Sequence, residues 1–110
     1  MALYLIRGSY TAAAIKAMVA EPQDREAAAR AAMEALGGTM HCFYFAFGDH
    51  DLVSICEFAD DKTMAAASFL VTSTGAFSKL ETTKLLTTAE AMKAMSTGQA
   101  AAAAYTPPTG

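Results

Sequence analysis

Four segments of the chain have the hydrophobic and polar pattern of β-strands. Each combines apolar with β-branched or aromatic residues, and each is bounded by glycine, proline or polar turn residues. The second and third segments are joined by a short connection that contains glycine, which is typical of a β-hairpin. The predicted strands are Ala2–Tyr10, Thr39–Phe47, Asp51–Phe58 and Phe77–Thr87.

The segments between these strands have helical patterns with recognisable starts and stops. The first crossover predicts two helical pieces, because a proline interrupts the pattern before it starts again in the first turn of the second piece. The last helix opens with the spacing of a capping box, in which Thr87 and Glu90 bond each other's backbone amides. The predicted N-caps are Thr11, Asp60 and Thr87, and the predicted breaks and stops are Pro22, Gly37, Gly75 and Gly98.

The order of these elements predicts the fold. Strand, helix, strand, strand, helix, strand is the βαββαβ order of the ferredoxin-like α+β fold. We expect a four-stranded antiparallel sheet with the two main helices on one face, followed by a C-terminal helix. We expect one domain over residues 1–98 and an alanine- and proline-rich tail over residues 99–110, where Pro107 and Pro108 cannot continue a helix.

The first three predicted strands are apolar or aromatic on both faces. Leu3 and Leu5 alternate with Tyr4 and Ile6, for example. An antiparallel sheet covered on one side alternates apolar with polar residues instead. The helices cover one face, and too little chain is left to cover the other. We therefore expect a homodimer or a higher homo-oligomer in which a second copy covers the open face.

Composition excludes several other partners. The 110 residues suit one domain, 54% of them are hydrophobic, and the formal net charge is −3. No basic stripe predicts nucleic-acid binding, and no apolar run approaches the roughly 20 residues of a membrane helix. Arg7 and Gly8 interrupt the first apolar run too early for a signal peptide, so we expect a cytoplasmic protein. Cys42 and Cys56 are then expected to be reduced.

The hairpin resembles a known family. The stretch FYFAFGDHDLVSICEFADD is similar to the core of the GYD domain family, small bacterial proteins of the dimeric α/β-barrel superfamily. The resemblance covers roughly residues 2–95, implies that the open sheet face packs in a dimeric barrel, and implies no established activity. His50 stands where the family's characteristic turn has tyrosine. The matching residues are Phe47, Gly48, Asp51, Leu52, Val53, Glu57 and Asp60.

The connection Gly48–Asp51 can be interpreted in two ways. It is a structural turn if Gly48 adopts a positive φ and Asp51 bonds the turn's own amides. It is a catalytic site if His50, beside Asp51, acts as a general base. These two residues are the catalytic candidates, and the structural turn is the favoured interpretation.

The second histidine, His41, begins a predicted strand and is either a plain strand-end residue or a ligand of metal or haem. The usual strand rise separates it from His50 by roughly 25–30 Å, so the two cannot share one ion within a subunit. We expect no metal and no cofactor.

Polar residues on the predicted sheet are candidates for a small-ligand pocket. They would be its convergent polar groups if they line a cavity between the sheet and a partner. The alternative is that they form edge-strand charges and interface salt bridges. The ligand-binding candidates are Tyr4, Arg7, His41, Tyr44, Glu57, Lys79 and Glu81.

Two classes of function remain. The first is a non-enzymatic, self-associating structural, ligand-sensing or partner-binding module. It is favoured because both sheet faces are apolar and because the chain has no Cys-x-x-Cys, His-Glu-x-x-His or glycine-rich phosphate motif. The second is a small-molecule enzyme, similar to a monooxygenase or isomerase, with a pocket at the sheet–sheet interface. That alternative rests on analogy of fold.

Overall fold

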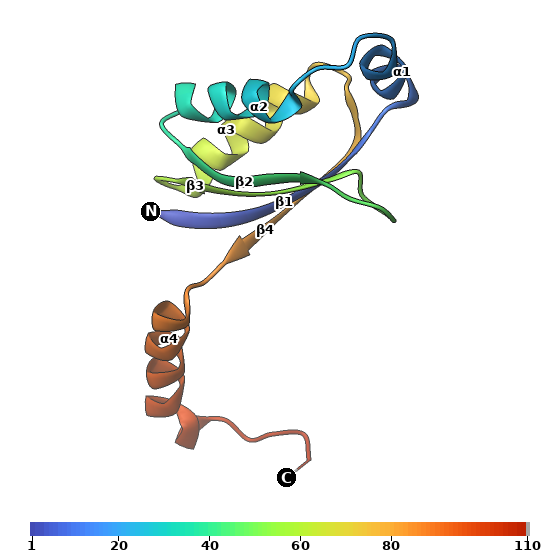
Figure 1. Cartoon of the computed structure of the whole chain (residues 1–110). Helices are drawn as coiled ribbons and strands as arrows, with labels where there is room; N and C mark the ends of the chain where they lie inside the picture. Colours follow the sequence, from blue (N-terminus) through green and yellow to red (C-terminus); the bar gives the residue numbers. More distant parts are fainter. Residues whose placement is uncertain (110) are drawn as a thin grey trace.

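The structure is a computed structural model that describes residues 1–109 (Figure 1). Its element order matches the predicted βαββαβ order, with the first crossover divided into two helices. The strands are β1 (Ala2–Tyr10), β2 (Thr39–Phe45), β3 (Leu52–Phe58) and β4 (Phe77–Leu85). The helices are α1 (Ala12–Ala20), α2 (Arg25–Ala35), α3 (Asp61–Thr72) and α4 (Thr88–Ala100), followed by a short 3₁₀ turn, η1 (Ala102–Ala104).

The four strands form one sheet in the order β2-β3-β1-β4, and every neighbouring pair is antiparallel. Helices α2 and α3 pack on the same face of this sheet (Figure 1). The predicted ferredoxin-like α+β fold is therefore confirmed.

The hydrophobic core lies between the sheet and these helices. Alternate residues of the two central strands point into it, as the period of a β-strand requires. Phe58 and Cys56 are completely buried, and both cysteines are free thiols. The core side chains are Tyr4, Ile6 and Tyr10 of β1, Leu52, Cys56 and Phe58 of β3, Met40 and Phe43 of β2, and Met33, Met64 and Ala67 of the helices.

The three predicted N-caps are confirmed. The side chains of Thr11, Asp60 and Thr87 accept hydrogen bonds from backbone amides of the first turns of α1, α3 and α4, and Thr87 forms the predicted capping box. The expected start of the second helix at Pro22 is wrong, because Asp24 caps α2 and the helix begins at the next residue. Asp24 supplies the carboxylate acceptor that an orphan amide needs, whereas proline supplies none.

A β-bulge in β2 changes the predicted faces of that strand. Met40 lies opposite Cys56 and Cys42 lies opposite Ile55, so β2 has one extra residue, at His41. Strict alternation along the strand would put His41 on the same face as Phe43, and the bulge breaks that alternation. The bulge lets Met40 and Phe43 both enter the core.

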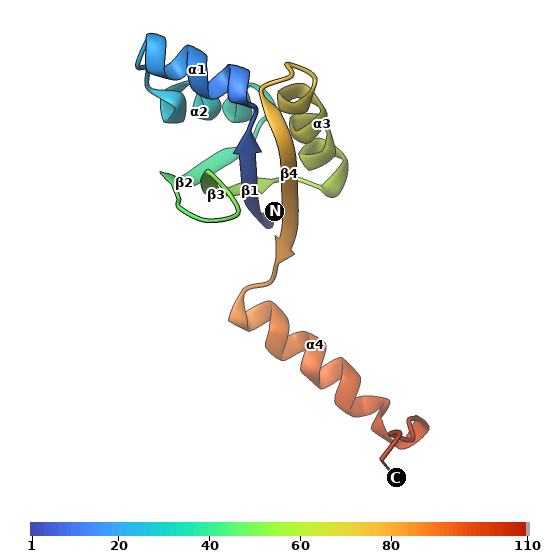
Figure 2. The ribbon, with the colours of Figure 1, turned by 90° about the vertical axis from the view of Figure 1, so that its right-hand side faces the viewer.

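Helix α4 projects away from the rest of the molecule. Figure 1 shows it beyond the uncovered side of the sheet, opposite α2 and α3, and Figure 2 shows the same separation from a perpendicular direction. The radius of gyration is 18.0 Å, compared with the roughly 13 Å that a compact chain of this length has. Within residues 1–109, no helix combines the length and apolar character needed to cross a membrane.

Candidate functional site

The sheet face that carries no helix is the candidate functional surface, and we call it the open face. Its centre is apolar, because Leu5 of β1 lies between Ile55 of β3 and Thr83 of β4. Tyr44 of β2 lies opposite Val53, and 65% of its surface is exposed. The strand registers assign to this face Leu3, Leu5, Arg7 and Ser9, Cys42 and Tyr44, Val53, Ile55 and Glu57, and Lys79, Glu81, Thr83 and Leu85.

One end of the open face has a group of charged side chains around Glu81, which we call the Glu81 cluster: Arg7, His50, Lys79 and Glu81. One carboxylate oxygen of Glu81 lies 3.0 Å from Lys79 Nζ. The other lies 3.3 Å from Arg7 Nη2 and 3.3 Å from His50 Nε2. The hydrogen bond from Lys79, with the nearby positive charges, holds the pKa of Glu81 below its usual value. The structure thus brings together three ligand-binding candidates and one catalytic candidate.

Two nitrogen atoms of the Glu81 cluster have no hydrogen-bond partner among the described residues. They are Arg7 Nε and His50 Nε2, and both atoms are buried. The contact between His50 and Glu81 is close enough for an ion pair but is not aligned as a hydrogen bond. A buried polar atom without a partner is unfavourable, so these two atoms leave the Glu81 cluster with unsatisfied hydrogen-bonding capacity.

The β2–β3 hairpin holds His50 in the cluster by bonding to β1. Gly48 has φ +99°, so the prediction of a positive φ is confirmed. The Asp51 backbone N–H donates to the Gly8 carbonyl at 2.7 Å, and the Asp51 carboxylate accepts from the Tyr10 N–H at 2.8 Å. The expectation that Asp51 bonds the turn's own amides is wrong. Its carboxylate instead joins the hairpin to the neighbouring strand.

The opposite end of the open face has a second polar pair. His41 Nε2 lies 2.9 Å from Glu57 Oε1, and both side chains are partly exposed. The register puts Glu57 opposite Leu3 and Glu81 opposite Arg7, which separates the two ends by about 13 Å along β1. The two histidines are thus held in separate pairs, and no three metal-ligating side chains of residues 1–109 gather at one point.

Tyr4 does not lie with the other candidates, because it points to the helix-covered face. It is buried, and its hydroxyl donates a hydrogen bond to the Asp61 carboxylate, which also pairs with Lys84 at 3.0 Å. The hydrogen bond to Asp61, with burial, raises the pKa of Tyr4 to about 12. The same bond, with that of Lys84, lowers the pKa of Asp61. This contact fixes the first residue of α3 to the sheet.

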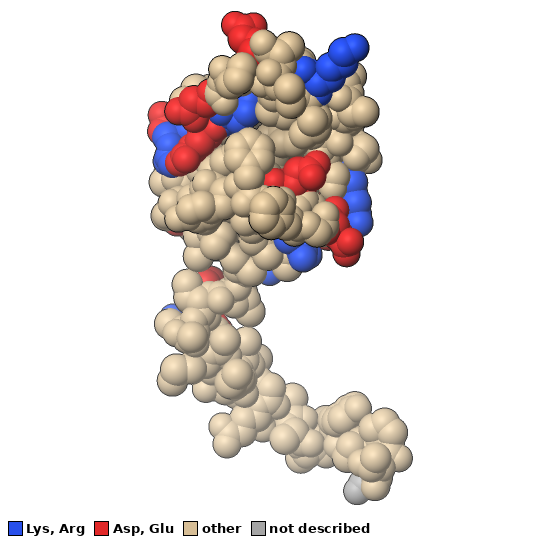
Figure 3. All heavy atoms as spheres, turned by 45° about the vertical axis from the view of Figure 1, so that its right-hand side comes forward, with Lys and Arg blue, Asp and Glu red and all other residues tan. Residues whose placement is uncertain are grey.

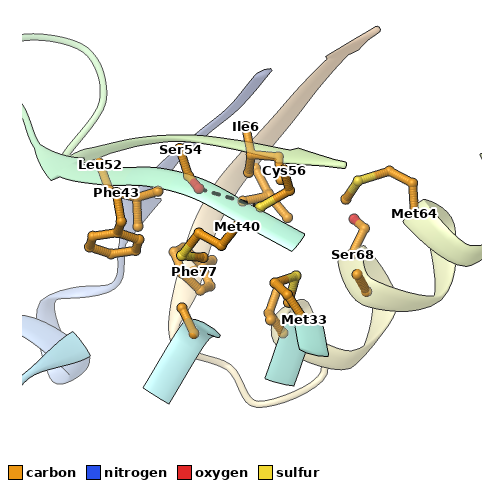
Figure 4. Close-up of a pocket in the computed structure, with 14 residues that line it drawn as sticks. Ile6, Met33, Met40, Phe43, Leu52, Ser54, Cys56, Met64, Ser68 and Phe77 are labelled. Carbon is orange, nitrogen blue, oxygen red and sulfur yellow. Dashed lines mark hydrogen bonds between the residues drawn. The ribbon is translucent and has the colours of Figure 1, made fainter. Parts of the chain in front are cut away.

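A small apolar cavity lies between the sheet and helices α2 and α3 (Figure 4). Its volume is about 60 Å³, and its lining includes Met33, Met40 and Met64. Ser54 reaches it but is satisfied, because its hydroxyl donates to the Cys42 carbonyl at 2.8 Å. Burial raises the pKa of the Cys56 thiol beside it. The cavity therefore lacks a charged or reactive group.

Comparison with known proteins identifies the family. No curated protein matches the chain. Among solved structures, the crystal structure of FFRP-DM1 is similar with a TM-score of 0.47 and 14% sequence identity, over 78% of this chain and 100% of that one. The model of the GYD domain matches residues 4–95, and the chain therefore belongs to the GYD domain family, as its hairpin sequence predicts.

Proposed function

We propose that this chain is a self-associating module whose open face binds a second copy of itself. The observation that supports the proposal is the uncovered apolar centre of the sheet, formed by side chains such as Leu5, Val53 and Ile55. A contiguous apolar surface of this kind is typical of an interaction site. Four hydrogen-bonded strands also present it as one continuous surface, which a matching sheet can cover.

The charges at the two ends of the open face favour a second copy as the partner. One end has two cations and one carboxylate, in Arg7, Lys79 and Glu81, and is net positive. The other end has the carboxylate of Glu57, paired with His41. A two-fold axis that reverses the strand direction places each positive end over the partner's negative end. Such electrostatic complementarity fixes the register of an interface.

The oligomeric state tests the proposal. Sedimentation equilibrium at low micromolar concentration should give about twice the chain mass of 11.5 kDa. The variant Ile55→Asp, in the centre of the open face, should sediment as a monomer, because the dimer would bury an unpaired charge. Val19→Asp is the matched control, since Val19 is 74% exposed on α1 and lies off this face. A wild-type chain that sediments only at 11.5 kDa contradicts the proposal.

A second variant keeps this test valid if Ile55→Asp fails to fold. Tyr44 also lies on the open face but is already 65% exposed in the single chain. The substitution Tyr44→Asp should therefore leave the circular dichroism spectrum unchanged and still weaken the dimer.

A second candidate function is the binding or conversion of a small molecule between the two sheets. It is supported by Arg7 Nε and His50 Nε2, the buried nitrogen atoms without partners. A carboxylate ligand would satisfy Arg7 Nε, and also His50 Nε2 when that nitrogen carries a proton, once the side chains turn to expose both atoms. Native mass spectrometry of freshly purified protein should then show a bound small molecule that the variant His50→Gln loses. A dimer that carries no ligand before or after incubation with small carboxylic acids counts against this candidate.

A further inference from the structure

Within residues 1–109, helix α4 makes no extensive contact with the sheet or with the other helices. None of its residues is buried, and it contacts mainly η1, the short turn that follows it. Met92 is 67% exposed and Met95 is 70% exposed, and Leu86 in the connection to β4 is 60% exposed. These are large apolar side chains, and the projecting segment presents all of them to solvent.

The helix carries its two large apolar side chains on one side, although most of its residues are alanine or polar. At 100° per residue, Met92 and Met95 are about 60° apart, and Thr88 and Gln99 lie between them. Lys93 and Thr97 lie on the opposite face. On the side shown in Figure 3, Asp, Glu, Lys and Arg atoms gather over the domain, whereas few are visible on the projecting helix. The two methionines are thus the exposed apolar part of α4.

An isolated helix of this length is not expected to persist in water. It has 13 residues, whereas isolated helices shorter than about 12–15 residues are marginal even for alanine-rich sequences. The capping box of Thr87 and Glu90 fixes its start but supplies no tertiary contact. A projecting helix with two exposed methionines is therefore expected to gain packing from outside its own domain.

We propose that α4 is an arm that packs its Met92 and Met95 face against the flank of a second copy seated on the open face. This inference rests on the sheet-to-sheet dimer proposed above. Figure 1 shows α4 on the uncovered side of the sheet, where that second copy would lie. A helix of 13 residues is about 20 Å long, which is enough to pass the partner's sheet and reach its helix layer about 10 Å beyond. The two-fold axis gives each copy one arm and one surface that receives an arm.

The size of the open face can be compared with the contact area that the arm would add to the proposed dimer. Four strands spaced about 4.8 Å apart, each covering about 20 Å, present roughly 400 Å² of flat area. An arm 20 Å long and about 10 Å across supplies roughly a further 200 Å² of flat area. The arm would therefore add about half as much contact area again to that of the sheet.

Hydrogen exchange of the full-length protein measures the packing directly. In the wild-type dimer we expect the α4 amides to be protected at least about tenfold over a free helix, because packing suppresses local opening. In the monomeric variant Ile55→Asp this protection should disappear, while the β1 and β3 amides stay protected. If the α4 amides are unprotected in a confirmed dimer, the proposal that α4 packs on the partner is wrong, and the proposed dimer still stands. If the α4 amides are equally protected in dimer and monomer, α4 packs on its own domain, and the proposal is also wrong.

Substitutions on the two faces of α4 give an independent test. The double variant Met92→Lys/Met95→Lys should raise the dimer dissociation constant at least about tenfold, because two large apolar side chains leave the interface. The control Thr97→Lys adds a lysine to the opposite face of α4. It should change the dimer dissociation constant less than about twofold. If the double variant and the control change the dissociation constant equally, the proposal that α4 packs on the partner is contradicted. A wild-type chain that is monomeric at every concentration contradicts both that proposal and the proposed dimer.

Discussion

The substitution Asp51→Ala tests how the hairpin is held against the sheet. The Asp51 carboxylate accepts the Tyr10 N–H at 2.8 Å, and no backbone carbonyl replaces it at that position of β1. A hydrogen bond to a charged acceptor contributes about 1.5–3 kcal/mol, and its removal also leaves the Tyr10 amide without a partner. We expect Asp51→Ala to lower the free energy of unfolding by about 2 kcal/mol. At roughly 4–8 °C per kcal/mol, the midpoint of thermal unfolding should fall by roughly 10 °C.

The neighbouring residue supplies the control for this prediction. Asp49 is exposed, and it accepts the Ser9 hydroxyl through its backbone carbonyl at 2.9 Å. The variant Asp49→Ala keeps that carbonyl and should change the free energy of unfolding by less than about 0.5 kcal/mol. Urea denaturation followed by circular dichroism measures both variants. Similar losses in the two, or no loss in Asp51→Ala, would refute the view that the carboxylate ties the hairpin to β1.

Three further predictions concern the packing, the pH dependence and the site. The variant Gly38→Ala should destabilise the fold by about 1–3 kcal/mol in urea denaturation, because a Cβ there lies 2.4 Å from the ring of the fully buried Phe58. The folded pKa of Tyr4, about 12, exceeds the usual 10, so stability supplied by its bond to Asp61 is present below pH 10 and lost as the pH rises towards 12. Denaturation at a series of pH values should show this loss in the wild type and not in Tyr4→Phe. The variant His50→Tyr should keep the fold and the sedimentation behaviour, and should change the free energy of unfolding by less than about 1 kcal/mol, because Nε2 makes no hydrogen bond to lose.

The features predicted correctly from the sequence are those whose causes are local. The capping box of Thr87 and Glu90 needs only two side chains three positions apart. The positive φ of Gly48 follows from the short connection between two strands. The alternation of β1 and β3 between core and open face follows from the period of a β-strand. Local rules of this kind were enough to give the order of the elements and the class of the fold.

The face of His41 depended on information that local periodicity does not contain. A bulge in β2 moves Met40 into the core and shifts the alternation of the strand by one residue. The bulge is favourable because Met40 packs there at 4% exposure, opposite the completely buried Cys56. That gain belongs to the packed core and is visible only once β3 is beside β2.

The Glu81 cluster is a second feature that local sequence patterns could not predict, and it belongs to the candidate functional site. Arg7 and Glu81 belong to strands far apart in the sequence, and their pairing requires the register of β1 against β4. His50 joins them because Asp51 bonds β1 and carries the hairpin to the sheet, a contact between residues 41 positions apart. The sequence predicted these side chains as separate polar candidates on strands and a turn. Tertiary hydrogen bonds, and not the charges themselves, make them one cluster. A substitution that weakens the attachment of the hairpin to β1, such as Asp51→Ala, should therefore also weaken the contact of His50 with Glu81 while leaving the contacts of Arg7 and Lys79 in place.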